Sequence, residues 1–277
     1  MRDTMQGHSD ERGRGLMRWR GRIAWWVSVA CLLLGMASPP AAFGDEIAIA
    51  AASDLSFAFK ELTVAFEKAQ GIRVRLSLGS SGNFFSQIQQ GAPFDLYFSA
   101  DVRYPQKLIE AGQAAADSLY RYAVGRIVVW VPNASALAVD RLGLDVLLDR
   151  SVKKIAIANP KHAPYGRAAV AALEQAKLYE RVKDKLVFGE NVSQAAQFVE
   201  SGAAEAGVIA LSLALAPPMH AAGTYWLVPD SAHLPLEQGA VIVSAARNRE
   251  GAQAFLRFLK TEEATRVMAR YGFLVPE

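Results

Sequence analysis

Four short segments contain residue types that could bind an anion without a positively charged side chain. Each follows an apolar run and precedes an amphipathic stretch, and each consists mainly of small polar, Pro or Gly residues: residues 52–55, 79–83, 163–166 and 190–193. The first N–H groups of a helix have no intrahelical acceptor and lie at the positive end of the helix dipole. Several such termini meeting at one point could bind a dianion.

The same residues have a common structural use. Ser53, Ser81, Asn191 and Ser193 could each cap the helix that follows. A hydrogen bond to a charged group contributes about 1.5–3 kcal/mol, so roughly six or seven would exceed the approximately 8 kcal/mol of micromolar affinity, even after ordering costs. None of the four turns contains a basic residue, although Lys161 lies just before the third. The sequence is therefore compatible with an anion site built from neutral donors.

Catalytic and metal motifs have little support. Residues 79–82 (GSSG) do not place glycines on both sides of a serine as a nucleophile elbow does, and no phosphate-binding loop of the G-x-x-x-x-G-K-[ST] type occurs. His162, His220 and His233 lack metal-ligand spacing. We expect no enzyme, no catalytic residue and no cofactor. A periplasmic serine hydrolase that uses Ser81, with His162 as base, is a remote alternative.

Asp54 directly follows Ser53, and its carboxylate would repel a dianion if it pointed toward the site. We expect it to point away and to complement the helix dipole. A site built only from hydrogen-bond donors would bind sulfate, thiosulfate or phosphate equally well. A receptor for one of these oxyanions is therefore the second hypothesis. An inward-pointing Asp54 would favour protonated phosphate, because its carboxylate could accept that proton.

The N-terminus has the order of parts of a secretory signal peptide. Arginines precede an uncharged apolar run, residues 23–37, which is followed by the segment SPPAAFG. The run is shorter than the roughly 20 residues of a membrane span, so we predict that residues 1–44 are removed on export to the periplasm. A retained anchor is the alternative. Lipidation at Cys31, the chain's one cysteine, is disfavoured because LLL follows it.

Net charge does not point to nucleic acid. Of 30 basic and 27 acidic residues, six arginines and three acids fall in the first 44 positions, which leaves 24 of each in the mature chain. The basicity therefore belongs mainly to the export signal, and we expect no nucleic-acid partner.

Short apolar runs alternate with longer amphipathic stretches along the mature chain. This alternation predicts an α/β fold with mainly parallel, buried strands. We expect strands near residues 46–51, 74–78, 96–98, 127–131, 155–158, 206–210, 225–228 and 241–243. We expect helices near 57–69, 84–90, 167–176, 195–201 and 252–271.

The mature chain resembles the periplasmic molybdate-binding proteins of ABC transporters over essentially its full length. Any one matching piece is weak, but their number and order are specific. The matching residues are 50–53 (AAAS), 79–81 (GSS), 87–88 (QI), 91–93 (GAP), 95–96 (DL), 98–101 (FSAD), 159–160 (NP), 162–164 (HAP), Gly166, 190–192 (ENV) and 270–273 (RYGF).

The resemblance implies a two-lobed protein that holds its anion in the cleft with serine hydroxyls and main-chain amides. Ser53 and Ser81 correspond to donors of the first lobe, and Tyr165 and Val192 to donors of the second, Val192 through its N–H. Some family members have a tyrosine where this chain has Ala210. We predict that the Tyr165 hydroxyl supplies that missing donor.

The resemblance also implies the rest of the assignment. We expect a monomeric receptor that delivers molybdate, and tungstate with it, to the membrane permease of an ABC importer. Molybdenum is bound only as the oxyanion, through the same four residues. Residues 45–124 plus 233–277 are expected to form lobe 1 and residues 125–232 lobe 2, with two chain crossings as a hinge. Cavity size would exclude the smaller sulfate.

Overall fold

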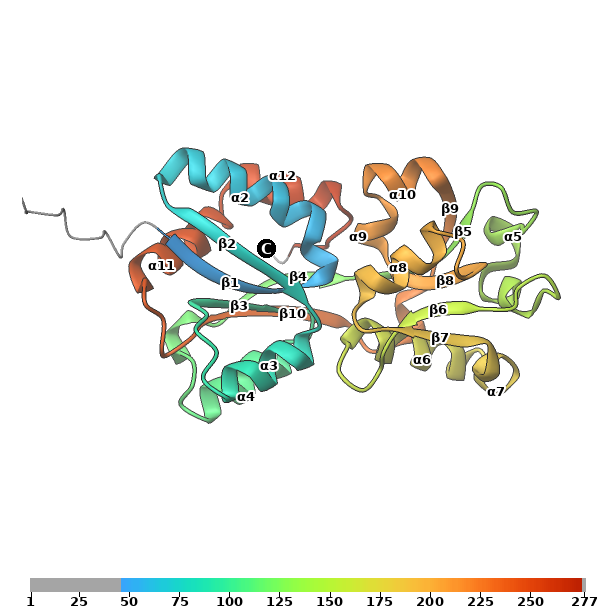
Figure 1. Cartoon of the computed structure of the whole chain (residues 1–277), viewed down its shortest axis with the longest axis horizontal. Coiled ribbons are helices and arrows are strands. Elements are labelled where there is room, and N and C mark those ends of the chain that lie inside the picture. The colour runs from blue at the N-terminus through green and yellow to red at the C-terminus, as the bar shows by residue number, and fades with distance from the viewer. Residues whose placement is uncertain (1–45, 276–277) are drawn as a thin grey trace, which may run out of the picture. The chain divides into compact units, whose positions relative to one another are not determined.

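The computed structural model describes residues 46–275, and the predicted signal peptide and Cys31 lie outside this range. The described chain forms two five-stranded sheets, each flanked by helices (Figure 1). The first sheet has the order β2-β1-β3-β10-β4 and the second β7-β6-β8-β5-β9. This confirms the predicted two-lobed α/β class.

The first sheet combines strands from both ends of the described chain. Its strands are β1 (Glu46–Ala52), β2 (Arg73–Gly79), β3 (Leu96–Ser99), β4 (Tyr120–Gly125) and β10 (Leu236–Ile242). β1 pairs in parallel with β2 and β3, whereas β10 is antiparallel to β3 and β4. The helical elements of this lobe are η1 (Ser53–Leu55), α2 (Ser56–Gln70), α3 (Ser81–Gln89), α4 (Arg103–Glu110), η2 (Ala116–Ser118), α11 (Arg249–Phe258) and α12 (Glu262–Arg270).

The second sheet comes from the intervening segment. Its strands are β5 (Ile127–Pro132), β6 (Ile155–Ala158), β7 (Leu186–Gly189), β8 (Ala206–Ala210) and β9 (Gly223–Leu227). β6 is parallel to β7 and β8, and β5 is antiparallel to β8 and β9. The helical elements are α5 (Val139–Leu142), η3 (Gly143–Leu148), α6 (Pro164–Gln175), α7 (Tyr179–Val182), η4 (Lys183–Lys185), α8 (Val192–Glu200), α9 (Leu211–Ala214), α10 (Pro217–Ala222) and η5 (Asp230–Ala232).

The chain passes between the sheets twice, from β4 to β5 and from β9 to β10. Sheet membership supports the predicted lobe boundaries, residues 45–124 plus 233–277 and 125–232, which remain a proposal. Both sheets are mixed, because one strand in each, β10 in the first and β5 in the second, is antiparallel to its neighbours.

Each lobe has its own apolar core. In the first lobe, α2 and α11 pack on one face of the sheet around Phe59, Phe66, Phe98 and Phe255, whose rings meet edge to face. α3 and α4 contribute a separate cluster that includes Phe84, Ile88 and Leu108, and they lie on the opposite face from α2 and α12 (Figure 1). The amphipathic stripes therefore face the sheets, as their spacing predicts.

The predicted elements were wrong or incomplete in several places. The helix expected over residues 252–271 is two helices, because α11 ends at Phe258 and Thr261 caps α12 by accepting from the Ala264 N–H at 3.3 Å. Strands β4 and β7 and helix α4 were not predicted, and in β4 Arg121 interrupts the apolar character. None of the helices in the described part of the chain has the length and apolar composition that a membrane span requires.

Candidate functional site

All four predicted anion-binding residues line one small cavity between the two lobes. Ser53 and Ser81 come from the first lobe, and Tyr165 and Val192 from the second. The cavity has a volume of about 10 Å³, far below the roughly 300–1,000 Å³ of pockets for drug-sized molecules. Its size therefore suits a small ion.

Ser53 is placed by the end of β1, where the chain turns directly into η1. Its side chain is buried, and its Oγ accepts a hydrogen bond from the Ser193 backbone N–H at 3.3 Å. Among the described residues this hydroxyl donates its own proton to no acceptor, so the proton is available to an anion.

Ser81 is the first residue of α3, which follows β2. The helix is capped by Ser80, whose Oγ accepts from the Asn83 N–H at 3.5 Å, so capping does not occupy Ser81. Ser81 Oγ accepts from the Ala100 N–H at 3.0 Å. Within residues 46–275 neither its hydroxyl proton nor its backbone N–H has an acceptor. Ser81 can therefore offer two donors.

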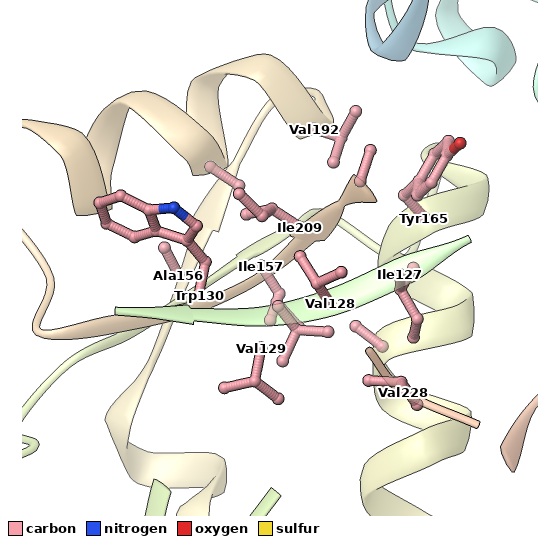
Figure 2. Packing of buried hydrophobic residues seen from close by; sticks show 14 of the residues in the cluster. Ile127, Val128, Val129, Trp130, Ala156, Ile157, Tyr165, Val192, Ile209 and Val228 are labelled. Atoms are coloured by element: carbon pink, nitrogen blue, oxygen red, sulfur yellow. The ribbon is translucent and has the colours of Figure 1, made fainter. Parts of the chain in front are cut away.

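Tyr165 and Val192 present backbone N–H groups at the starts of two helices. Pro164 opens α6, so Tyr165 carries the first N–H after the N-cap, and Val192 is the first residue of α8, capped by the Asn191 side chain. Neither N–H has a backbone acceptor in the described chain. Both residues lie at one end of the second-lobe core, with the Tyr165 hydroxyl pointing away from the aliphatic cluster (Figure 2).

Asp54 also lines the cavity, contrary to the expectation that it points away. It is 1% exposed, and its Oδ2 accepts from the Tyr165 hydroxyl at 2.9 Å and from Gln238 Nε2 at 2.7 Å. Its Oδ1 has no partner among the described residues. Burial raises the pKa of Asp54 to about 6, although the hydrogen bonds from Gln238 and Tyr165 oppose this shift. The expectation failed because the carboxylate is held by groups that only the folded lobes bring to it.

The Tyr165 hydroxyl is therefore engaged in this structure. A hydroxyl has one proton, and that of Tyr165 goes to Asp54, while its oxygen accepts from Gln238 Nε2 at 3.0 Å. Ala210, which has no hydroxyl to offer, is fully buried at the end of β8. For Tyr165 to act as the predicted replacement donor, its hydroxyl must stop donating to Asp54 and donate to the anion instead.

Gln238 was missed by the sequence analysis. It lies on β10 at 0% exposure, and the other residues of the strand are apolar and buried except the exposed Glu237. A polar side chain at an inward position of an alternating strand is the signal that could have identified it.

His162 contacts Ser80 rather than Ser81. Its Nδ1 lies 2.9 Å from Ser80 Oγ, and its carbonyl oxygen accepts from the same hydroxyl at 2.9 Å. Among the described residues no histidine contacts Ser81 Oγ, so the base that the hydrolase alternative needs is not at its nucleophile. Residues 46–275 also contain no group of three or more His, Cys, Asp or Glu side chains that could hold a metal ion.

Contacts around the cavity join the lobes. The Gly82 N–H donates to the His162 carbonyl at 2.9 Å, and Ser193 Oγ donates to the Ser53 carbonyl at 2.8 Å. An ion pair joins Arg167 to Asp101 at 2.8 Å. The structure thus has the lobes in contact on several sides of the site.

Comparison with known proteins agrees with this architecture. The family model described as "Bacterial extracellular solute-binding protein" matches residues 47–274. The chain belongs to this solute-binding protein family. Among its relatives, the molybdate-binding protein ModA of Azotobacter vinelandii is 41% identical over 84% of this chain and 91% of its own length. That of Rhodobacter capsulatus is 37% identical over 90% of this chain and 95% of its own length.

Solved structures show the same fold for this solute-binding protein. The periplasmic molybdate-binding protein of Azotobacter vinelandii superimposes with a TM-score of 0.79 at 32% identity, covering 83% of this chain and all of that one. The sulfate-binding protein SubI of Mycobacterium tuberculosis has a TM-score of 0.69 at 16% identity, covering 84% of this chain and 87% of that one. The second likeness supports the fold alone.

Proposed function

We propose that this solute-binding protein is the periplasmic receptor of an ABC importer and that it binds molybdate. The observation that carries the proposal is the convergence of neutral donors from both lobes on one small cavity. The hydroxyls of Ser53 and Ser81 and the N–H groups of Ser81, Tyr165 and Val192 are without acceptors in the described chain. The relatives at 37% and 41% identity are named as molybdate-binding proteins.

These five donors reach the required magnitude toward the upper end of their range. At about 1.5–3 kcal/mol for each hydrogen bond to a charged group, they supply roughly 8–15 kcal/mol before ordering costs. Micromolar affinity needs about 8 kcal/mol. No lysine or arginine is required, and among the described residues none lines the cavity.

Closure around the anion is the functional step of the proposal. Donors come from both lobes, so a bound anion stabilises the conformation in which the lobes meet. That conformation is what the permease would recognise. Release of molybdate to the permease then requires no chemistry on the ligand, which is why we assign no catalytic residue.

Tungstate is included in the proposal because it has the same shape and charge as molybdate. Sulfate is also tetrahedral but smaller, so it cannot reach all five donors at once. We further propose that the protein is monomeric and that residues 1–44 direct it to the periplasm.

Phosphate is the second candidate, on the observation that Asp54 lines the cavity. The unpartnered Oδ1 of Asp54 could accept the proton of hydrogen phosphate. A fully deprotonated anion gains nothing from that acceptor. The two candidates therefore differ in whether the bound ligand carries a proton.

Thermal unfolding of the protein recovered from the periplasm of an expression host, with molybdate, tungstate, sulfate and phosphate in separate samples, tests the proposal. A ligand at 100 times its Kd adds about 2.7 kcal/mol to the free energy of unfolding, so the midpoint should rise by roughly 5–10 °C. We expect this rise with molybdate and tungstate. A rise with phosphate alone would replace the ligand, and no rise with any anion would refute the function.

A further inference from the structure

Asp54 places a buried carboxylate beside the donors proposed to hold a dianion. Its hydrogen-bond partners, Tyr165 and Gln238, are both neutral, and Oδ1 has no partner in the described chain. Two negative charges a few ångströms apart in a water-poor cavity repel strongly. The site as built therefore needs a compensating positive charge when the anion enters.

No cation supplies that charge among residues 46–275. The titratable groups that face Asp54 are Tyr165 on α6 and Tyr122 on β4, and burial raises the pKa of each phenol well above 10, which keeps both neutral. α9 contributes only the Ser212 hydroxyl, which donates to the Asp54 carbonyl at 2.8 Å. β10 contributes the neutral Gln238, and α8 the Ser193 that binds Ser53. No ion pair to Asp54 exists in this part of the chain, and the nearby α2 lysine, Lys60, lines a neighbouring cavity instead.

We propose that anion binding is coupled to the uptake of one proton by Asp54, and that this proton reverses the Asp54–Tyr165 hydrogen bond so that Tyr165 donates to the anion. The inference rests on the proposed function and states how the same site neutralises itself. The proton comes from solvent and ends on Asp54 Oδ2. Tyr165 keeps its own proton covalently and changes only its acceptor.

The geometry permits this reversal without moving the residues apart. Asp54 Oδ2 and the Tyr165 oxygen are 2.9 Å apart, and a hydrogen bond of that length can run in either direction. Gln238 Nε2 donates to both oxygens, at 2.7 and 3.0 Å, and a protonated carboxyl and a phenol can each still accept. The coupling thus releases the Tyr165 hydroxyl from Asp54, so that it can donate to the anion. Ala210 has no hydroxyl with which to do so.

The coupling has a definite sign with pH. Burial already raises the pKa of Asp54 to about 6, and a dianion beside it raises that pKa further. Above pH 6 the free protein therefore has an ionised Asp54 that must gain a proton on binding. The affinity consequently falls as the pH rises, by at most about tenfold per pH unit for one proton.

Isothermal titration with molybdate measures the proton directly. Titrations at pH 7.5 in two buffers with different ionisation enthalpies give the number of protons taken up per anion, which we expect to be close to one. In a pH series from 6.5 to 8.5, the Kd for molybdate should rise progressively. Molybdate keeps its dianionic charge throughout this range. Binding with no proton uptake and a constant Kd would overturn the coupling and leave the proposed function standing.

Two variants assign the proton to its residue. Asp54→Asn should abolish proton uptake and flatten the pH dependence of Kd. The matched control is His162→Gln, because histidine is the side chain that ordinarily changes charge near neutral pH and His162 contacts Ser80 at the same cavity. The His162→Gln variant should keep both the proton uptake and the pH dependence of Kd. Uptake that persists in Asp54→Asn would overturn the assignment, and the buffer comparison on the unmodified protein holds even if that variant does not fold.

A third variant tests the tyrosine step. Tyr165→Phe should weaken molybdate binding by about tenfold or more at pH 6.5, as loss of one charge-assisted hydrogen bond requires. An unchanged affinity would show that the Tyr165 hydroxyl is not a donor, although the Tyr165 backbone N–H could still be one. In contrast, the absence of any heat of binding when molybdate is titrated into the unmodified protein would refute the proposed function itself.

Discussion

The backbone N–H of Gly82, in the first lobe, donates to the carbonyl oxygen of His162, in the second, over an N···O distance of 2.9 Å. A Cβ atom at Gly82 would lie 2.7 Å from that oxygen and 3.0 Å from the His162 Cα. The obstacle is backbone, which cannot rotate aside. This glycine is therefore required by the contact between lobes rather than by its own helix.

Gly82→Ala should weaken anion binding by about tenfold or more, since even 1.4 kcal/mol lost from the closed conformation has that effect. Stability without ligand should hold or rise slightly, because alanine is favoured over glycine in a helix by roughly 1 kcal/mol. Calorimetric titration and thermal unfolding measure the two effects. Gln89→Ala, on the exposed face of the same helix, is the control and should bind normally. Equal affinity of both variants would contradict a closure role for Gly82.

Ser53→Ala and Ser81→Ala should each lower anion affinity by roughly 10- to 150-fold, the equivalent of one hydrogen bond of about 1.5–3 kcal/mol to a charged group. Ser81→Ala should also destabilise the protein by about 1–3 kcal/mol, because it leaves the buried Ala100 N–H without its acceptor. Titration and chemical denaturation separate these effects. Ser201→Ala, at an exposed helix end, is the matched control. Serine variants that bind like this control would remove both hydroxyls from the site.

Phe255→Ala should destabilise the first lobe by about 3–5 kcal/mol. Phe255 is fully buried and its ring contacts those of Phe59, Phe66 and Phe98. For a chain of this size the unfolding midpoint should fall by roughly 10 °C, while the fraction that remains folded binds anion normally. Differential scanning calorimetry checks this result against Val64→Ala, which removes a 63% exposed side chain. A similar midpoint for the two variants would show that the aromatic cluster is dispensable.

The four turns could be predicted from sequence because their structure is local. A strand that ends one or two residues before Ser53 or Ser81 and leads directly into a helix specifies where free N–H groups and hydroxyls lie. Neighbouring parallel strands end at the same edge of a sheet, so β1 and β2 bring these two residues together. The family resemblance and the α/β class are confirmed, whereas the binding roles of the four residues remain predictions.

The orientation of Asp54 could not be predicted in the same way. Its carboxylate is held by Tyr165, 111 positions later, and by Gln238, 184 positions later. First-turn statistics place an acidic residue toward solvent, but here burial between the lobes prevails. Local rules fail at this residue because its partners come from elements that only the tertiary fold brings together.

Arg167 on α6 forms an ion pair with Asp101, which follows β3, at 2.8 Å across the lobes. Asp101 is largely buried and also binds Arg103 at 2.7 Å. Burial acts to raise the pKa of Asp101, but the hydrogen bonds and charge of Arg103 and the charge of Arg167 outweigh it and hold the pKa below its ordinary value. Because Arg103 would still neutralise Asp101, removing Arg167 leaves no isolated buried charge.

Arg167→Met should therefore weaken anion binding only about fivefold, which corresponds to about 1 kcal/mol for a partly exposed ion pair. The difference from the unmodified protein should persist at neutral pH. It should also be constant between pH 6.5 and 8.5, because a carboxylate with a depressed pKa stays ionised until the pH falls below its ordinary value of about 4. Titrations at pH 6.5, 7.5 and 8.5 measure it. Glu174→Gln, later on the same helix and exposed, controls for a general charge effect. A loss of a hundredfold or more would mean that Arg167 contacts the anion itself, and no loss at neutral pH would mean that the pair does not contribute to closure.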